Sequence, residues 1–315
     1  MSKSDKNVKE EVENILKQSK KPEKPTTCHC CGKEYRSMHD ITHGPNTMTE
    51  VAYLNEIFRR HPIAHINDTV DTYLCTEAMC RHIYRHYYPS AADFHAGEYR
   101  EDQLDKETGS LFKKDSIQQI QARKEKSFRQ LTYLKDFISS EYTALEVASG
   151  RGYALNVAKE IFKSVTGSDI DPKVVDHNKI FNPDVEIRLY DILKMPEEDK
   201  YDVIMAFDVL EHIEEADKFA SKMYGLANKY VMIQVPVDRK IAPPNFHLIK
   251  NPEPHHAPFD GHVHYFTEHS LNNLFTKDGM FKCVFMYKTE RGEVANGREI
   301  MAVFEKIEQN TTKEN

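Results

Sequence analysis

The sequence lacks any long apolar segment. No run approaches the roughly 18 apolar residues that a transmembrane helix requires, so we expect no contact with a membrane. The first 26 residues mix lysine with glutamate and contain no apolar core of the kind found in signal peptides. We therefore expect a cytoplasmic protein in which residues 1–26 form an unstructured arm and residues 307–315 an unstructured tail.

An excess of positive charge is also missing, because the 315-residue chain has a formal net charge of −7. General nucleic-acid binders use surplus positive charge to neutralise phosphates, so the balance disfavours a nucleic-acid partner. One locally basic segment, 113–135, is interpreted either as a solvated helix face or as a contact for an anionic substrate. The hydrophobic content of 39% is enough to bury a core.

Cysteine is nearly absent after residue 80, since five of the six cysteines precede that point. Four of these five form two pairs with short spacings, Cys28-x2-Cys31-Gly32 and Cys75-x4-Cys80. Disulfides are disfavoured in a reducing compartment, and four thiolates on two tight turns can hold one tetrahedral zinc ion. We expect a structural zinc module over residues 27–90, with Cys30 as a spare and His29 or His82 able to replace a sulfur. The alternative is a small domain whose cysteines bind nothing.

Residues 91–115 are polar and turn-rich, and are expected to form a linker or a substrate-facing loop. From residue 116 to 306, short apolar strands alternate with helices. The first expected helix begins after Ser116 and has one apolar stripe, formed by Ile117, Ile120, Phe128, Leu131, Leu134 and Ile138. Residues 164–169 are expected to form a strand, and the helix after them to begin at Pro172 with Asp171 as its N-cap. Such alternation predicts an α/β fold with a mostly parallel, Rossmann-like sheet covered on both faces, ending in two antiparallel strands.

The stretch ALEVASGRGYAL, residues 144–155, places a glycine turn between the first strand of this sheet and the next helix. A dinucleotide site needs a third small residue after two glycines, but Leu155 stands in that place. The pattern is instead E-x-A-x-G-x-G, formed by Glu146, Ala148, Gly150 and Gly152. It suits an amino-acid and sulfonium group that passes close to the backbone, with the acid placed to receive an ammonium group.

Three further acids end the next three strands: Asp169, Asp191 and Asp208. Ligands of parallel α/β sheets bind at the carboxyl ends of the strands, so these acids and Glu146 should form one rim. Asp169 is placed to accept ribose hydroxyls, and Asp191 to accept from an adenine amino group. Taken singly, each aspartate could instead merely cap the helix that follows it.

These segments, together with DVLEHI and GHVHYFTEHSL, resemble the class I S-adenosylmethionine-dependent methyltransferases over residues 116–305. The resemblance implies a seven-stranded sheet whose last strand is reversed. It implies that Glu146, Gly150 and Gly152 flank the methionine part of the cofactor, Asp169 the ribose, and Asp191 with Ile192 the adenine. The full predicted cofactor-binding set is Glu146, Ala148, Gly150, Gly152, Asp169, Ile170, Asp191, Ile192 and Asp208.

A narrower resemblance is to the sugar C-methyltransferases, which also carry an N-terminal four-cysteine zinc module and a histidine just ahead of an aromatic-Phe pair. That resemblance implies that His262 is a catalytic base. Histidine suits this role because its unperturbed pKa of about 6.5 lies near neutrality. His264 and His212 are the next candidates. The histidine-rich segment 247–269 contains no regular H-x3-H or H-E-x2-H pattern, which disfavours a metal site there.

The sequence therefore predicts a methyltransferase with a small-molecule acceptor, of which a sugar or nucleotide-sugar is preferred. A quinone or lipid precursor is the first alternative, and an RNA or protein substrate bound through the cysteine module is the second. A non-catalytic interaction scaffold is the third. An amino-methylating DNA enzyme is disfavoured, because the chain has DVLE where those enzymes carry an Asp/Asn-Pro-Pro-aromatic run.

Overall fold

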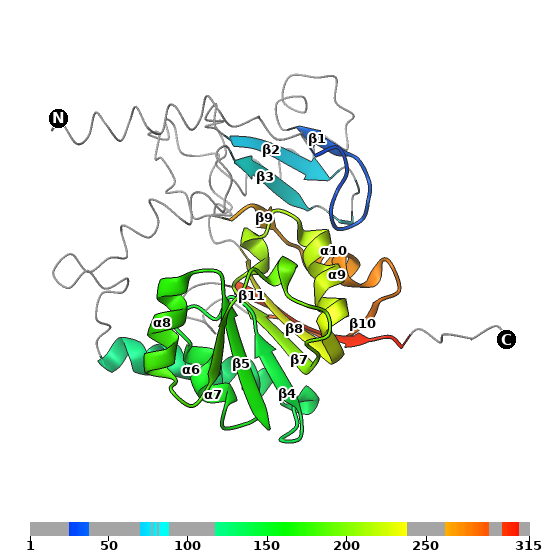
Figure 1. Ribbon diagram of the computed structural model, residues 1–315. Helices are drawn as coiled ribbons and strands as arrows, with labels where there is room; N and C mark the ends of the chain where they lie inside the picture. The colour runs from blue at the N-terminus through cyan, green and yellow to red at the C-terminus, as the bar shows by residue number, and fades with distance from the viewer. Residues whose placement is uncertain are drawn as a thin grey trace, which may run out of the picture.

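The computed structural model describes residues 25–37, 70–75, 77, 79–80, 82–87, 117–237, 262–289 and 298–308. Four expected features lie wholly or mostly outside these ranges: the linker at 91–115, the cap at Ser116, the arm at 1–26 and the tail at 307–315. Within them the chain forms two sheets, a large one with helices on both faces and a small one at its edge (Figure 1). No helix in the described part of the chain combines the length and apolarity needed to cross a membrane.

The large sheet has seven strands in the order β10-β11-β8-β7-β4-β5-β6. All neighbouring strands are parallel except at β11, which runs antiparallel to both β8 and β10. The predicted seven-stranded α/β sheet with one reversed strand is therefore confirmed. Its strands are β4 Thr143–Glu146, β5 Ser164–Asp169, β6 Glu186–Leu189, β7 Tyr201–Phe207, β8 Ala227–Val237, β10 Phe281–Lys288 and β11 Arg298–Lys306.

Five α-helices and three short 3-10 helices accompany these strands in the described ranges. They are α6 Ile117–Tyr133, η1 Lys135–Phe137, α7 Tyr153–Ala158, α8 Pro172–Phe181, η2 Ile192–Lys194, η3 Leu210–His212, α9 Ala216–Leu226 and α10 Glu268–Thr276. The expected start of α8 is confirmed, since the carboxylate of Asp171 accepts the backbone N–H of Lys173 at 3.0 Å.

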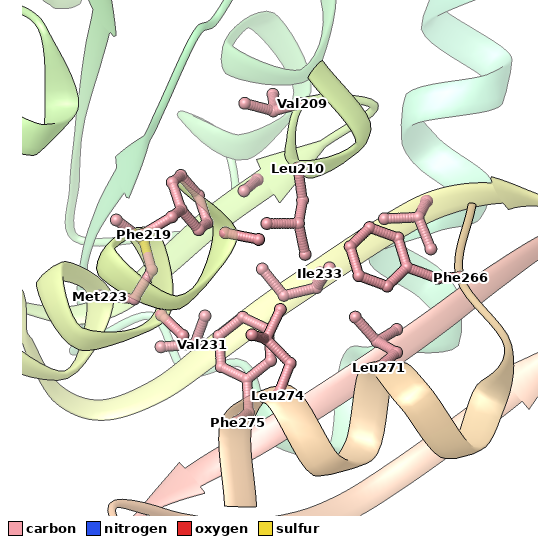
Figure 2. Packing of buried hydrophobic residues seen from close by; sticks show 14 of the residues in the cluster. Val209, Leu210, Phe219, Met223, Val231, Ile233, Phe266, Leu271, Leu274 and Phe275 are labelled. Atoms are coloured by element: carbon pink, nitrogen blue, oxygen red, sulfur yellow. The ribbon is translucent and has the colours of Figure 1, made fainter. Parts of the chain in front are cut away.

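Each face of the sheet has its own core, because side chains alternate along each strand. Val203 and Met205 of β7 pack with α6, α7 and α8 on one face. Ile204 and Ala206 point to the other face, which α9 and α10 cover. Figure 2 shows this second core, where residues of α9, α10 and β8 interdigitate: Phe219, Met223, Val231, Ile233, Leu271, Leu274 and Phe275. The two cores together fix the strand ends that carry the candidate site.

The apolar stripe predicted for α6 is wrong in part. Ile117 and Phe128 are 82% and 60% exposed, whereas Leu131 is buried as expected. The polar side chains of Ser127 and Gln130 are buried instead. They are buried because α6 faces polar groups at the ends of β7 and β8, where the Gln130 amide donates to Gln234 Oε1 at 2.6 Å.

The small sheet has the order β1-β2-β3-β9 and is antiparallel throughout. Its strands are β1 Tyr35–Ser37, β2 Val70–Cys75, β3 Ile83–Tyr87 and β9 His264–Tyr265. The first three belong to the predicted cysteine module, but β9 belongs to the segment that precedes α10. Tyr84 pairs with His264 and Ile83 with Tyr265. The cysteine module and the main domain therefore share one sheet (Figure 1).

Candidate functional site

The turn between β4 and α7 has three residues with positive φ, namely Ala148 at 50°, Gly150 at 51° and Gly152 at 73°. This conformation favours glycine, and at Gly152 space requires it as well. A Cβ there would lie 1.8 Å from Oδ1 of Asn178 on α8. The Asn178 amide donates to the Gly150 carbonyl, and the Asn182 amide donates to the Gly152 carbonyl at 3.0 Å. Two asparagines that no sequence motif indicated thus hold the glycine backbone in place.

Asp169, at the end of β5, hydrogen-bonds to the backbone of this turn. Its Oδ2 accepts the backbone N–H of Gly150 at 3.1 Å, and its Oδ1 accepts that of Asp171 at 3.0 Å. The carboxylate is buried, whereas the side chain of the next residue, Ile170, is 61% exposed. An acid beside an exposed apolar side chain, at the edge of the sheet, has the chemistry to bind a sugar hydroxyl next to a flat ring.

Glu146 ends β4 and is buried under the same turn. Burial raises the pKa of its carboxyl to about 8. A hydrogen bond from the Leu155 backbone lowers this pKa in part, and the negative charge of Asp169 raises it further. Its Oε2 has no hydrogen-bond partner among the described residues. The hydroxyl of Ser149, within the turn, is likewise without a partner in that part of the chain. A buried acid with an unsatisfied oxygen is suited to a cationic ligand group.

Asp191 follows β6, and its carboxylate mainly serves the local backbone. Oδ1 accepts the N–H of Leu193 at 3.1 Å and so caps η2, while Oδ2 pairs with the Lys194 ammonium at 2.9 Å. Ile192 is buried in the core. The capping alternative weighed in the sequence analysis is therefore observed at Asp191, and its predicted contact with adenine stays a prediction.

Asp208 follows β7 with a positive φ of 56°. Its carboxylate accepts from the Lys126 ammonium at 2.7 Å and from the Gln234 amide at 2.9 Å. Lys126, on α6, also lies 3.1 Å from Oε1 of Glu299 on β11. Asp208 is thus held by partners from two distant elements, α6 and β8, and Lys126 supplies the neutralising charge. Local sequence spacing carries no signal for such pairs, so none of them could be predicted.

The three candidate histidines occupy different environments. His264 is buried, and burial, followed by the nearby His82 and His29 imidazoles, lowers its pKa well below the ordinary value. Its Nε2 donates to the Ile213 carbonyl at 2.8 Å, and its Nδ1 lies 3.2 Å from Nε2 of His82. With both nitrogens engaged inside the protein, His264 is poorly placed to take a proton from a substrate.

His212 and His262 are partly exposed and lie together. Their ring centroids are 4.8 Å apart in an edge-to-face arrangement. His212 belongs to η3, directly after β7, so the pair lies at the same edge of the large sheet as Asp208. Beside them, burial and the charge of Asp208 raise the pKa of Glu211 well above its ordinary value. The structure therefore brings two of the three predicted bases to the rim of the candidate site.

The four predicted metal ligands, Cys28, Cys31, Cys75 and Cys80, have sulfur atoms that all lie within 4.8 Å of one another. The Cys28 and Cys80 sulfurs are 3.8 Å apart, and those of Cys31 and Cys75 are 3.4 Å apart. Zinc–sulfur bonds of about 2.3 Å in a tetrahedron place sulfurs about 3.8 Å apart, so the cluster fits zinc. All six cysteines are described, and none forms a disulfide.

Two turns and a glycine build this cluster. The Gly32 N–H donates to the Cys28 carbonyl at 2.8 Å with Gly32 at φ 70°, and the Cys75 N–H donates to the His82 carbonyl at 3.0 Å. Cys30, the expected spare, is fully buried nearby, and Cys28, Cys30 and His82 form a second possible group. His82 Nδ1 already lies 2.7 Å from the Tyr35 hydroxyl, which favours the four-sulfur set.

A family model described as a methyltransferase domain matches residues 106–281, more than half of the chain. A curated relative, a probable S-adenosylmethionine-dependent methyltransferase of Mycolicibacterium smegmatis, is 31% identical over 81 residues. That match covers 25% of this chain and 32% of the relative, so it spans about a third of the relative's length.

Two solved structures are also similar. Magnesium protoporphyrin IX methyltransferase of Synechocystis, with bound S-adenosylmethionine, is 14% identical with a TM-score of 0.46, and the match covers 66% of this chain and 95% of that one. N-methyltransferase NodS of Bradyrhizobium japonicum, in complex with S-adenosylhomocysteine, is 15% identical with a TM-score of 0.47, covering 67% and 97%.

Proposed function

The chain belongs to the methyltransferase-domain family, and we propose that it transfers a methyl group from S-adenosylmethionine to a small sugar or nucleotide-sugar. One observation carries the cofactor assignment. Glu146 and Asp169 flank one glycine turn at the carboxyl edge of the sheet, and the buried Oε2 of Glu146 has no partner among the described residues. An ammonium group would satisfy that oxygen.

The cofactor assignment follows the geometry of the turn. The bare backbone of Gly150 and Gly152 would lie along the methionine portion, with Glu146 receiving its ammonium group. Asp169 would accept the ribose hydroxyls, and the exposed Ile170 side chain would pack against the adenine ring. Asp191 and Ile192, with Ala148 and Asp208, complete the proposed set, with Asp208 held in place by Lys126.

The position of the cysteine module supports an acceptor bound between the two sheets. β9 completes the small sheet, and His262 lies two residues before β9. The module is thereby fixed next to His212 and His262 at the rim. The same combination of a four-cysteine module and a histidine ahead of an aromatic-Phe pair underlies the resemblance to sugar C-methyltransferases, and it favours a sugar-like acceptor.

Methyl transfer is an in-line displacement, for which S-adenosylmethionine, when bound, supplies a methyl group on an activated sulfonium. The protein must align the acceptor and remove a proton if the acceptor is an alcohol or an acidic carbon. His262 and His212 are the proposed bases, because they are partly exposed at the rim. His264 is not retained in this role, since it is buried and both of its nitrogens are engaged.

We also propose that Cys28, Cys31, Cys75 and Cys80 bind a structural zinc ion. The four sulfurs close a tetrahedral site, which leaves no position for a substrate. In this arrangement zinc stabilises the turn that leads into β1 and the turn that joins β2 to β3, and so the small sheet that β9 completes.

Isothermal titration of the full chain with S-adenosylmethionine tests the cofactor assignment. Asp169→Ala should weaken binding at least about tenfold, because hydrogen bonds to charged groups contribute about 1.5–3 kcal/mol. Asp176→Ala, at an exposed position of α8, is the matched control and should bind like the unaltered chain. Equal affinity for both variants would refute the ribose assignment, and no binding by the unaltered chain would leave the scaffold alternative.

Methyl transfer from labelled S-adenosylmethionine tests the acceptor. Separate pools of nucleotide-sugars, quinols, RNA and proteins would be incubated with the zinc-loaded chain, and the label located by mass spectrometry. Label in the nucleotide-sugar pool alone is the expected result. Label in any other pool would overturn the proposed acceptor class while leaving the methyltransferase assignment intact.

A further inference from the structure

Glu211, His212 and His262 form a second cluster of metal-ligating side chains at the rim. One ligand atom from each lies within 4.8 Å of the other two. Glu211 and His212 belong to η3, which follows β7, whereas His262 stands just before β9. The Val263 N–H donates to the Glu211 carbonyl at 2.8 Å and so joins the two segments. This backbone hydrogen bond fixes the relative positions of the three side chains.

Glu211 is buried but incompletely paired. Its side chain is 2% exposed, and its Oε1 lies 3.8 Å from His212 Nε2. Its Oε2 has no hydrogen-bond partner within the described ranges. The Lys126 ammonium, which could neutralise a carboxylate at this edge, already pairs with Asp208 and Glu299. A buried carboxylate oxygen without a partner is suited to a bound cation.

We propose that Glu211, His212 and His262 bind one divalent first-row transition-metal cation. Two imidazoles and one carboxylate are ligands that such cations prefer, and a set of three leaves coordination positions open. His212 has 25% of its side chain exposed, so solvent reaches the edge of the cluster. Sequence spacing disfavoured a metal in this region because the ligands come from two separated segments that only the fold brings together.

This site is independent of the cysteine cluster in both place and chemistry. The cysteine cluster offers four sulfurs and is closed, whereas the Glu211 cluster offers nitrogen and oxygen ligands and is open. His264, which comes two residues after His262, lies outside the new site because its nitrogens contact Ile213 and His82. The two clusters should therefore load separately and be distinguishable by their spectra.

The role of the site rests on the proposed function, although metal binding itself does not. An open divalent cation at the rim would orient oxygen substituents of the acceptor, which sugars carry on adjacent carbons. Binding would occupy one nitrogen of each imidazole. For His212 and His262, the roles of metal ligand and general base are therefore alternatives that an experiment can separate.

The test uses the full chain with zinc already loaded at the cysteines, titrated with Co²⁺ and followed by absorbance and elemental analysis. We expect one additional Co²⁺ per chain without the intense thiolate charge-transfer absorption that cobalt at cysteines would give. Glu211→Gln and His262→Gln should each lower Co²⁺ affinity at least about tenfold, since each removes one ligand. Zinc content and thermal unfolding should stay unchanged, which separates loss of the site from loss of the fold.

Glu160→Gln and His269→Gln are the matched controls, because Glu160 is exposed in the turn after α7 and His269 hydrogen-bonds to Asn273 within α10. Both should bind Co²⁺ like the unaltered chain. No additional Co²⁺ in the unaltered chain, or equal affinity in Glu211→Gln, would overturn the inference. S-adenosylmethionine binding is measured in parallel. If the unaltered chain binds Co²⁺ but not S-adenosylmethionine, the proposed function is refuted while the metal site is supported.

Discussion

Nε2 of His82 lies 3.2 Å from Nδ1 of His264, and this contact joins the cysteine module to the main domain. Because Nε2 of His264 donates to the Ile213 carbonyl, its Nδ1 must accept, and His82 Nε2 must carry the proton. Nδ1 of His82 then accepts from the Tyr35 hydroxyl at 2.7 Å. One directed series of hydrogen bonds therefore runs from β1 through both rings to the loop after η3.

Replacing His264 with phenylalanine should loosen this junction. The substitution keeps an aromatic ring but leaves the His82 N–H and the Ile213 carbonyl without partners, which costs about 1–3 kcal/mol of unfolding free energy. Denaturant unfolding measures the loss, and His269→Gln serves as the control with little change expected. Affinity for S-adenosylmethionine should persist. Unchanged stability together with abolished turnover would instead restore His264 as a catalytic base.

In the four-sulfur assignment Cys75 is a zinc ligand and Cys30 is not, although both side chains are fully buried. Cys75→Ser should release zinc readily to a chelator and lower the melting temperature, because three ligands hold the ion more weakly than four. Cys30→Ala should retain about one zinc per chain. Elemental analysis after chelator treatment measures both. The reverse pattern would assign the metal to Cys28, Cys30 and His82 instead.

The sequence predicted those parts of the fold that depend on local patterns. Strand β5 and the start of α8 at Pro172 match because apolar runs, an N-capping aspartate and a proline act within a few residues. The glycine turn could be predicted for the same reason, since Gly150 and Gly152 both adopt positive φ. The two cysteine pairs could be predicted because each lies on a tight turn with a short spacing, which is a local feature.

Contacts between distant segments account for what the sequence did not predict. The stripe on α6 is wrong at Phe128 because the buried face of the helix is set by Gln234, on a strand far along the chain. The pairing of β9 with β3, and hence the burial of His264, depends on two segments of different domains meeting. Charge pairs such as Lys126 with Asp208 exist only after the sheet has formed.

Gly150 and Gly152 have similar φ values but should respond differently to alanine. At Gly150 a Cβ would meet only the Ala148 carbonyl, at 4.0 Å, so the cost is backbone strain of about 1–2 kcal/mol. At Gly152 it would lie 1.8 Å from Asn178 Oδ1, which adds an overpacking cost of about 1–3 kcal/mol. Thermal unfolding of both variants measures the difference. Adding Asn178→Ala should recover part of the lost stability in Gly152→Ala but none in Gly150→Ala. Equal losses of stability at the two glycines would contradict this prediction.

Glu146 should make the stability of the unliganded chain depend on pH. Its pKa is raised to about 8 by burial, with Asp169 contributing, whereas an unfolded glutamate titrates near 4.3. Between these values the native state binds the extra proton, so the unfolding free energy should fall as pH rises through this window. Glu146→Gln removes the titration and should flatten the slope. Denaturant unfolding from pH 5 to 8 measures it, and an equally steep slope in Glu146→Gln would contradict the assignment.

The same carboxyl should make cofactor binding release a proton. Below pH 8 the unliganded Glu146 is mostly protonated, whereas an ammonium ligand favours the ionised form, so affinity for S-adenosylmethionine should rise from pH 5.5 to 7.5 by up to about tenfold per pH unit. Calorimetry in two buffers of different ionisation enthalpy counts the released proton. Glu146→Gln should bind more weakly and release none, while Glu160→Gln should behave like the unaltered chain. A pH-independent affinity in the unaltered chain would mean that the ammonium group is held elsewhere.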